Sequence, residues 1–281
     1  MKEIKVLARI LFNKLKTDLD KIEKDILLTL IPVVACTLVY LLGLEDLFIL
    51  KYPSDLPRLL LTSYTSNFVH ETFNHLISNM IIYLLCSFAS LIILRMMNLK
   101  FFRKTLLAIL LLVPFICSAA TILIFEKYPS QNVREACGFS GVSSATVGVL
   151  IFCFALFAAF EKGSLVRDDT IHTHFIAFFC APYYFLASYF EKGYILIILP
   201  FIPIIKLMWK YRRRKEKLGI IFITSLLCVV ITYCSSKIFF PYIIIQNKII
   251  TNVFAHSAGF IPGIFLPILF CQIELQKQRL K

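Results

Sequence analysis

The feature that most constrains this chain is a series of uncharged apolar runs, each long enough to cross a lipid bilayer as a helix. About 20 helical residues, rising about 1.5 Å each, cross the roughly 30 Å of hydrocarbon in a membrane. Among its 281 residues the chain has runs of this kind at 26–42, 76–94, 105–125, 140–160, 171–190, 194–209, 218–236 and 249–270. The sequence therefore predicts an all-α, polytopic membrane protein with eight spans.

Composition supports a membrane protein and excludes several soluble classes. Hydrophobic residues make up 59% of the chain and charged residues only 17%, against about 25% charged residues in a typical soluble domain. A soluble fold of this length cannot hide so much apolar surface. The runs also lack the period of two that marks the strands of a membrane barrel, so helices remain as the way to satisfy the backbone in lipid. An ordinary cytosolic enzyme, a disordered protein and a soluble nucleic-acid binder are excluded.

The net charge of +13 suggests a nucleic-acid partner until the basic residues are assigned to the two sides of the membrane. With the N-terminus inside and eight spans, the inside segments hold 22 of the 30 Lys and Arg residues, and the outside loops hold seven. Cytoplasmic segments of membrane proteins carry such an excess of positive charge. The bias also supports the short run at 194–209, which contains Pro200 and Pro203, because without it the cluster from Lys210 to Lys217 would lie outside. We therefore expect cytoplasmic termini beside anionic lipids and no nucleic-acid partner.

Three regions follow from this pattern. Residues 1–25 lack the apolar core and cleavage site of a signal peptide, and they carry apolar residues at helical spacing among charged ones. We interpret them as a cytoplasmic amphipathic segment on the inner membrane surface, the alternative being a helix or tail exposed to solvent. Residues 26–272 form the transmembrane domain, and residues 273–281 form a cytoplasmic tail.

Polar residues within lipid are costly and tend to mark functional sites. All 17 Asp and Glu residues lie in loops, tails or the ends of runs, which weakens the case for a proton- or sodium-coupled transporter. The nine cysteines show no Cys-x-x-Cys spacing, so we interpret them as packing residues and expect no metal site. Cys137 lies next to one of the motifs described below.

Two short motifs place polar residues at the outer ends of the second and fourth runs. His75 and Asn79 are four residues apart, so they share one helix face and can direct donors the same way. Ser140, between Gly138 and Gly141, begins the fourth run, where the glycines leave its hydroxyl uncrowded and backbone N–H groups are free. Each motif alone is also consistent with helix packing or capping.

A third motif lies at the start of the eighth run, where His256 shares a helix face with small residues. The fourth run carries a similar small-residue face, and two such faces can approach each other closely. This approach would bring Ser140 within reach of His256 near the outer membrane face. The two faces are formed by Ser140, Ser144 and Gly148, and by Ala255, Gly259 and Gly263.

These three motifs, in this order, resemble those of the rhomboid family of intramembrane serine proteases. The matching patterns are His-x-x-x-Asn, Gly-x-Ser-Gly and His-x-x-Gly-x-x-x-Gly, and His70 upstream of His75 also fits. The resemblance extends from about the first run to the eighth. It implies a rhomboid-like six-helix core, here with about two additional transmembrane helices.

The resemblance also implies the roles of individual residues. Ser140 would be the nucleophile and His256 its general base, with no cofactor and no metal. His75, Asn79 and the backbone N–H of Ser140 would form the oxyanion hole. Packing around these residues would be supported by Gly138, Gly141, Gly259, Gly263 and His70. The implied substrate is a transmembrane helix of another protein in a prokaryotic cell membrane. Residues 239–245 would form a flap over the site or simply lead into the eighth run.

The chain departs from the family pattern at three points. The first outer loop contains Arg58 but lacks the Trp of a common Trp-Arg pair. The fourth residue after Ser140 is Ser144 rather than an aromatic residue, so His256 must be oriented in another way. Three runs separate Ser140 from His256 instead of one, which still leaves both at the same membrane face. We favour 218–236 as the core span among them.

Two other functions compete with proteolysis. A catalytically inactive rhomboid-like protein that binds or moves membrane clients would be favoured by loss of Ser140 or His256, yet both are present. A transporter or channel would need polar residues along a pore, whereas these cluster near one face. The sequence therefore favours an active protease.

Overall fold

The computed structural model describes residues 19–127, 135–161, 164–165, 245–246, 249–250 and 253–279, with isolated positions between 205 and 226. The described helices are α2 (Leu19–Leu41), α3 (Glu45–Phe48), α4 (Leu56–Thr65), η1 (Ser66–Phe68), α5 (Phe73–Met96), α6 (Phe102–Lys127), α7 (Ser140–Ala159) and α12 (Val253–Arg279). The described strands form three antiparallel pairs, namely β1 (Leu50–Lys51) with β2 (Glu135–Ala136), β3 (Phe160–Glu161) with β4 (Ser164–Leu165), and β5 (Ile245–Gln246) with β6 (Ile249–Ile250).

Five of the described helices are long and apolar enough to cross a membrane. They are Ile22–Leu41 within α2, α5, α6, Ser140–Phe157 within α7, and Ala255–Lys277 within α12. The described part of the chain is thus that of an all-α membrane protein, and these helices match the first four and the eighth of the apolar runs. Several predicted segments lie almost wholly outside the described residues, namely the runs at 171–190, 194–209 and 218–236 and the candidate flap at 239–245. Residues 1–18 also lie outside them.

Two helices are longer than the apolar runs that they contain. α2 starts at Leu19, inside the segment interpreted as 1–25, and α12 continues to Arg279, through most of the expected tail at 273–281. The residues added at the end of α12 are mainly Gln, Glu, Leu and Lys, which have high helix propensity. Helical hydrogen bonding therefore continues where the apolar run has ended.

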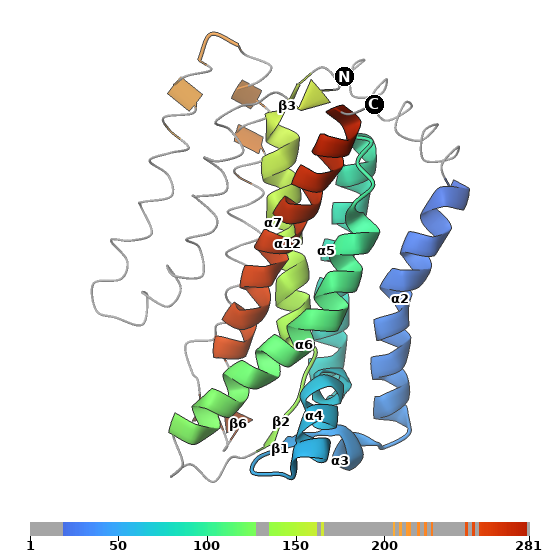
Figure 1. Cartoon of the computed structure of the whole chain (residues 1–281), viewed down its shortest axis with the longest axis vertical. Coiled ribbons are helices and arrows are strands. Elements are labelled where there is room, and N and C mark those ends of the chain that lie inside the picture. Colours follow the sequence, from blue (N-terminus) through green and yellow to red (C-terminus); the bar gives the residue numbers. More distant parts are fainter. Residues whose placement is uncertain are drawn as a thin grey trace.

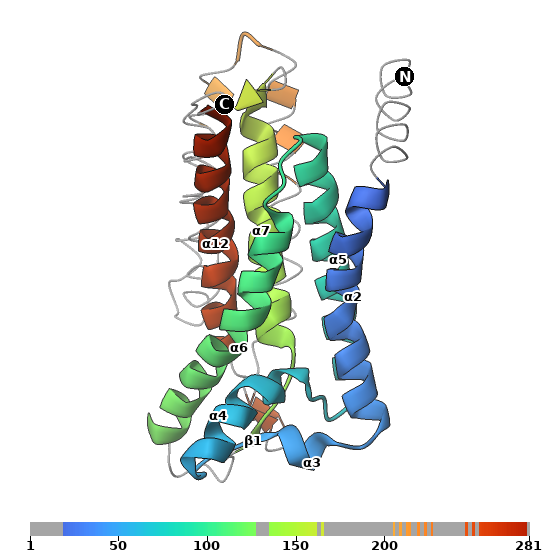
Figure 2. The same ribbon diagram turned by 45° about the vertical axis from the view of Figure 1, so that its right-hand side comes forward.

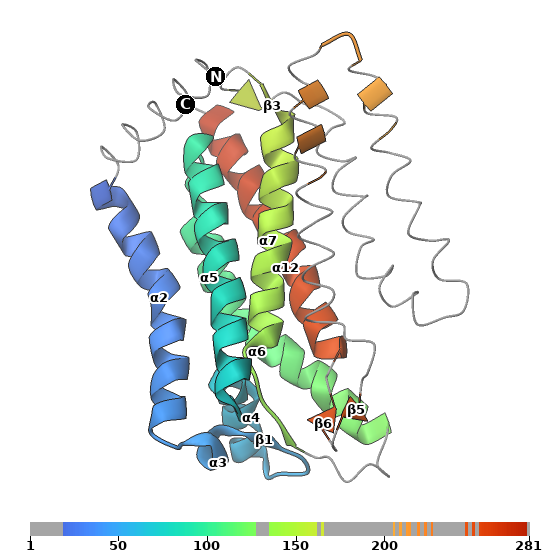
Figure 3. The same cartoon turned by 180° about the vertical axis from the view of Figure 1, so that it is seen from behind.

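α7 is the central helix of the described bundle. Buried residues make up 83% of its apolar window, against 22% in α2. α5 and α12 lie on either side of α7, and α2 lies on the outer side of α5 (Figures 1 and 3). On the outer faces of the other spans, large apolar side chains remain exposed, among them Leu27, Leu85, Leu111 and Phe265. An apolar surface of this extent suits contact with lipid rather than water.

Short elements gather at the end of the bundle where α5 and α7 begin (Figures 1 and 2). α3, β1, α4 and η1 all belong to the connection between α2 and α5. β1 pairs with β2, so that Leu50 lies opposite Ala136 and Lys51 opposite Glu135. The Lys51 ammonium also lies 3.2 Å from the Glu135 carboxylate. These contacts hold the first loop against the segment that leads into α7.

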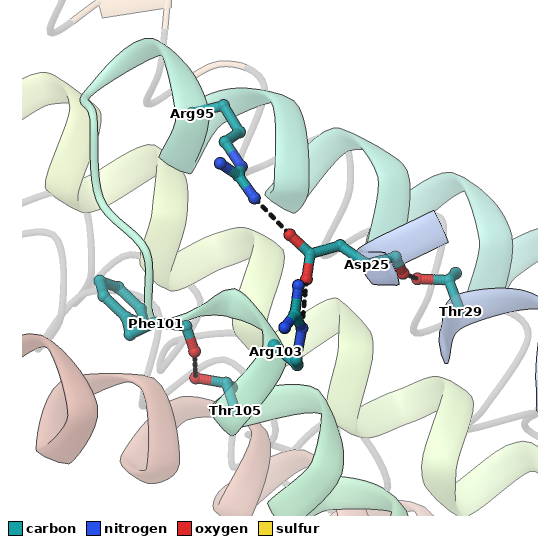
Figure 4. A network of polar contacts seen from close by, with 6 residues as sticks. All are labelled: Asp25, Thr29, Arg95, Phe101, Arg103 and Thr105. Carbon is teal, nitrogen blue, oxygen red and sulfur yellow. Dashed lines mark hydrogen bonds and ion pairs between the residues drawn. The ribbon is translucent and has the colours of Figure 1, made fainter. Parts of the chain in front are cut away.

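The opposite end of the bundle contains a buried acid (Figure 4). The Asp25 side chain of α2 is 3% exposed and accepts hydrogen bonds from Arg95 Nη2 at 2.5 Å and Arg103 Nε at 2.8 Å. Arg95 lies in the last turn of α5 and Arg103 in the first turn of α6. A buried carboxylate is tolerated only when it is paired. This ion-pair cluster therefore fastens α2 to the α5–α6 connection.

Candidate active site

The first turns of α7 and α12 bring a serine and a histidine into direct contact. Ser140 is the first residue of α7, and the first helical hydrogen bond joins Ser143 N–H to the Phe139 carbonyl at 2.9 Å. His256 lies in the first turn of α12 and is 6% exposed, while Ser140 is half-buried. Ser140 Oγ and His256 Nε2 are 2.7 Å apart. That distance is within the range in which a base can take a proton from a hydroxyl.

Glycines allow α7 and α12 to approach closely enough for this contact. A Cβ atom at Gly259 would collide with the backbone of Gly141, and one at Gly263 would collide with the backbone of Ala145. At Gly148 a Cβ atom would lie 2.8 Å from the Phe260 carbonyl oxygen. The small-residue faces of α7 and α12 therefore lie against each other, with backbone meeting backbone. The Ser140–His256 contact depends on this short separation.

The backbone around His256 is fixed by two side chains from neighbouring helices. Ser144 Oγ, one turn beyond Ser140, donates to the His256 carbonyl oxygen at 2.8 Å. Cys117 Sγ of α6 donates to the Ala255 carbonyl oxygen at 3.2 Å. In place of an aromatic ring, position 144 thus supplies a hydroxyl that holds the main chain of the histidine. Cys117 was expected only to pack, and nothing in its sequence surroundings indicated this contact.

Gly138 shapes the loop that precedes the serine. Its φ of +124° lies in the region that L side chains rarely adopt. A Cβ atom here would also lie 2.8 Å from Cε1 of His75, so the His75 ring sits directly against the glycine. The Gly138 N–H donates to the Ser66 carbonyl oxygen at 3.0 Å. Both the backbone conformation and the space at this position therefore require glycine.

Phe139 anchors the same loop in the interior. Its side chain is fully buried, with its ring centroid 5.5 Å from that of Phe68 and 5.1 Å from that of Tyr83. Its backbone N–H donates to His70 Nε2 at 3.4 Å. Phe139 occupies the unspecified position of the Gly-x-Ser-Gly motif, and Tyr83 lies outside the motifs. The ring contacts of Phe139 with Phe68 and Tyr83 fix the residue that comes immediately before Ser140.

His70 connects this loop to α5. The ring is fully buried, and its Nε2 lies 3.2 Å from Asn79 Nδ2 in addition to accepting from Phe139 N–H. An Nε2 that accepts from a backbone N–H carries no proton itself, so the proton of the neutral ring is on Nδ1. Burial lowers the pKa of His70 to about 3, and the neighbouring His75 acts in the same direction. His70 is therefore neutral at physiological pH and acts as a hydrogen-bond acceptor.

Asn79 and His75 of α5 face the loop before the serine and the first turn of α7. Asn79 is buried, and one hydrogen of its amide is directed to His70, which leaves the second hydrogen as a further donor. Ser143 Oγ donates to the Asn79 carbonyl oxygen at 3.0 Å, which joins α5 to α7 within one turn of Ser140. The second amide hydrogen of Asn79 and the first N–H groups of α7 are thus donors close to Ser143 and Ser140.

Cys137 lies close to the site without the properties of a nucleophile. Its Sγ donates to Glu71 Oε1 at 3.8 Å. Burial, with the negative charge of Glu71 acting the same way, raises the pKa of this thiol to about 12. The thiol is therefore protonated at neutral pH, and a thiolate is the reactive form of cysteine. The hydroxyl of Ser140 remains the candidate nucleophile.

The structure brings Ser140, His256, His75, Asn79 and His70 together at one end of the bundle. Within the described ranges, His, Cys, Asp and Glu side chains form no group of three or more that could hold a metal ion. Comparisons of the chain with models of protein families, with curated proteins and with solved structures find no match. The chemistry of the site is therefore inferred from its own residues.

Proposed function

We propose that this chain is an intramembrane serine protease of the rhomboid type. The observation that carries the proposal is the 2.7 Å separation of Ser140 Oγ and His256 Nε2. Support also comes from the three sequence motifs, whose residues include both members of this pair. The proposed architecture is a rhomboid-like six-helix core with about two additional helices. It has eight spans and cytoplasmic termini in a prokaryotic cell membrane.

The proposed reaction begins when His256 Nε2 takes the proton of Ser140 Oγ. The oxygen then attacks the carbonyl carbon of a substrate peptide bond, and the negative charge formed on the carbonyl oxygen is stabilised by His75, Asn79 and the Ser140 N–H. His256 returns the proton to the leaving amine, which releases the first product. Water activated by the same histidine then hydrolyses the acyl-enzyme.

The proposed substrate is a transmembrane helix of another protein. A hydrogen-bonded helix shields its carbonyl groups, so the substrate must unwind locally before Ser140 can attack. Small or helix-breaking residues near its outer membrane boundary favour this unwinding. Ser140 begins α7, whereas Asp25 lies near the start of α2, and these two helix starts are at opposite ends of the bundle (Figure 1), which is consistent with cleavage close to one membrane face.

Reconstitution of the full chain in liposomes with a single-span substrate tests the dyad. We expect Ser140→Ala and His256→Ala each to lower the cleavage rate by about 10³-fold or more, because removal of either member of such a pair disables both. Ser78→Ala is the matched control, since this exposed serine of α5 donates only to the Asn74 carbonyl oxygen at 2.7 Å. Undiminished cleavage by either dyad variant would contradict the mechanism.

A serine-directed covalent inhibitor gives a second readout that does not depend on finding the right substrate. We expect a fluorophosphonate probe to label the parent at Ser140, as located by mass spectrometry, and to leave His256→Ala unlabelled. Labelling that persists in His256→Ala would show that His256 is not the base that activates Ser140. Binding of membrane clients by a parent chain that neither cleaves nor reacts would instead favour a rhomboid-like protein without catalysis.

A further inference from the structure

A small cavity with a largely apolar surface and four hydroxyl-bearing residues in its lining lies between α5, α6 and α7, away from the candidate active site. Its volume is about 10 Å³, and it is lined by Ser87 and Ser90 of α5, Thr105 of α6 and Thr146 of α7, with Ile109 and Val149 among its apolar walls. Ser87 lies eight residues beyond Asn79 along α5, or roughly 12 Å at about 1.5 Å per residue. The cavity is therefore within the transmembrane part of the bundle, about the size that one water molecule needs.

The two serines present hydroxyl groups that the described residues do not satisfy. Ser87 is 2% exposed and Ser90 is fully buried, and neither Oγ has a hydrogen-bond partner in the described part of the chain. The Tyr83 hydroxyl interacts with Ser87 and the Cys153 thiol with Ser90, but neither contact has the geometry of a full hydrogen bond to the serine oxygen. A buried hydroxyl without a partner is costly, and lipid offers none.

The threonines complete the set of groups that a small polar molecule needs. Thr105 Oγ1 donates to the Phe101 carbonyl oxygen at 3.2 Å, and Thr146 Oγ1 donates to the Ser143 carbonyl oxygen at 2.7 Å. Their hydrogens are thus occupied, while each oxygen keeps lone pairs that can accept. The cavity combines two hydroxyl donors with two hydroxyl acceptors. Water is the one molecule of this size that can serve all four.

We propose that this cavity is a binding site for a single ordered water molecule. The water accepts hydrogen bonds from Ser87 and Ser90 and donates to the oxygens of Thr105 and Thr146, which joins α5 to α7 and to the first turn of α6. The site is separate from Ser140 and His256, so it does not depend on the proposed function.

An experimental structure of the full chain in lipid, at a resolution that shows ordered water, tests the site directly. We expect one peak within about 3.2 Å of both Ser87 Oγ and Ser90 Oγ. An empty cavity would overturn the proposal. So would a structure in which the two hydroxyls turn to Tyr83 and Cys153 and leave no space for water.

Thermal unfolding in lipid bicelles tests the same site through its energetics. We expect Ser87→Ala and Ser90→Ala each to lower the midpoint by about 2–4 °C, because each removes a hydrogen bond to the water. The midpoint of the double variant should fall by clearly less than the sum of the two single falls, since both serines hold the same water molecule. Ser78→Ala, an exposed serine of the same helix, should leave the midpoint unchanged.

Two outcomes of the unfolding experiment would overturn the water site. An unchanged or raised midpoint in the single variants would mean that the hydroxyls are unsatisfied in a dry cavity, where their removal is neutral or stabilising. Additive losses in the double variant would mean that Ser87 and Ser90 have separate partners.

Discussion

The position of the Ser140 hydroxyl is set by backbone contacts on both sides of it. Before the serine, the Gly138 N–H donates to the Ser66 carbonyl oxygen and the Phe139 N–H donates to His70. After it, Ser144 holds the carbonyl oxygen of His256. These bonds align the starts of α7 and α12 with each other. The proposed catalysis would depend on preorganisation of this kind.

Substitution of Gly138 tests the preorganisation at a single residue. In Gly138→Ala, both the strain at φ +124° and the collision with the His75 ring displace the loop. We expect cleavage to fall by about 100-fold, because a displacement of about 1 Å costs that much. The measurement is kcat/KM with the single-span substrate.

The matched control for this substitution is Gly43→Ala. Gly43 also has a positive φ, +63°, but a Cβ atom there meets only the Glu45 side chain, at 3.9 Å. We expect this variant to lose a little stability and to cleave normally. If Gly138→Ala cleaves as well as Gly43→Ala, the loop geometry does not limit the reaction.

The neutral state of His70 predicts how stability depends on pH. The pKa of His70 in the fold, about 3, lies below its ordinary value near 6.5. Between these values the unfolded chain binds a proton that the folded chain does not, so the free energy of unfolding falls as pH is lowered from about 6.5 to about 3. We expect the thermal midpoint of the parent to fall more steeply over this range than that of His70→Gln. Equal slopes would show that this histidine is not held neutral.

At the scale of helices, two kinds of contact hold the described bundle together. α7 and α12 meet through backbone at Gly141 and Gly259, where no side chain intervenes. α2 has far less buried surface and is fastened instead by Asp25 to Arg95 and Arg103. The first contact is central to the dyad, and the second lies at the far end of the molecule. A change at the Gly141–Gly259 contact should therefore affect cleavage, and a change at the Asp25 cluster should affect stability.

Substitution of Gly259 tests the first kind of contact. In Gly259→Ala the added Cβ atom meets the backbone of Gly141, which forces α12 away from α7 and lengthens the Ser140–His256 contact. We expect a loss of cleavage of about 10- to 100-fold, measured as kcat/KM. Gly219→Ala is the control, because no described atom lies within 4 Å of a Cβ atom there. Normal cleavage by Gly259→Ala would mean that the close approach is not needed.

Substitution of Asp25 tests the second kind of contact. Asp25→Asn removes the carboxylate that Arg95 and Arg103 share, and we expect the free energy of unfolding to fall by about 3 kcal/mol, at the low end for buried pairs because Arg103 is 43% exposed. Glu23→Gln removes an exposed acid two residues away and should have no effect. Cleavage per folded molecule should stay at the parent level in both variants. A loss of cleavage without a loss of stability would contradict a purely structural role.

At the scale of the whole molecule, the site and the ion-pair cluster lie at opposite ends of the bundle. α2 begins, and α5 and α12 end, at the Asp25 end (Figure 1). The connection with α3, β1 and α4 lies at the end that carries Ser140. The charge bias of the sequence predicts that the Asp25 end faces the cytoplasm. The dyad would then face the outside.

Labelling with a membrane-impermeant maleimide in intact cells tests this orientation. In a Cys137→Ser background, we expect Asp46→Cys to be labelled from outside and Lys100→Cys to be protected until the membrane is broken. Asp46 lies in α3 at the dyad end, and the exposed Lys100 lies between α5 and α6 at the Asp25 end. The reverse pattern would place the dyad in the cytoplasm.

The amino-acid sequence by itself determined the features that depend on neighbouring residues. The length of each apolar run indicates a membrane-spanning helix, because hydrocarbon thickness sets that length. Spacings of four and three residues place His75 with Asn79, and His256 with Gly259, on one helix face, because the helix has 3.6 residues per turn. The five described spans agree with the first expectation. The start of α2 and the end of α12 were less predictable, since both helices continue beyond their apolar residues.

Only the tertiary structure decided which faces meet. Ser140 and His256 are separated by 116 positions, and their 2.7 Å contact exists because glycines let α7 and α12 approach. The pairing of Asp25 with two arginines and the cavity beside Ser87 likewise join helices that no local pattern connects. Such contacts depend on the rotation and separation of packed helices. These are properties of the whole bundle, because each helix is positioned by all of its neighbours at once.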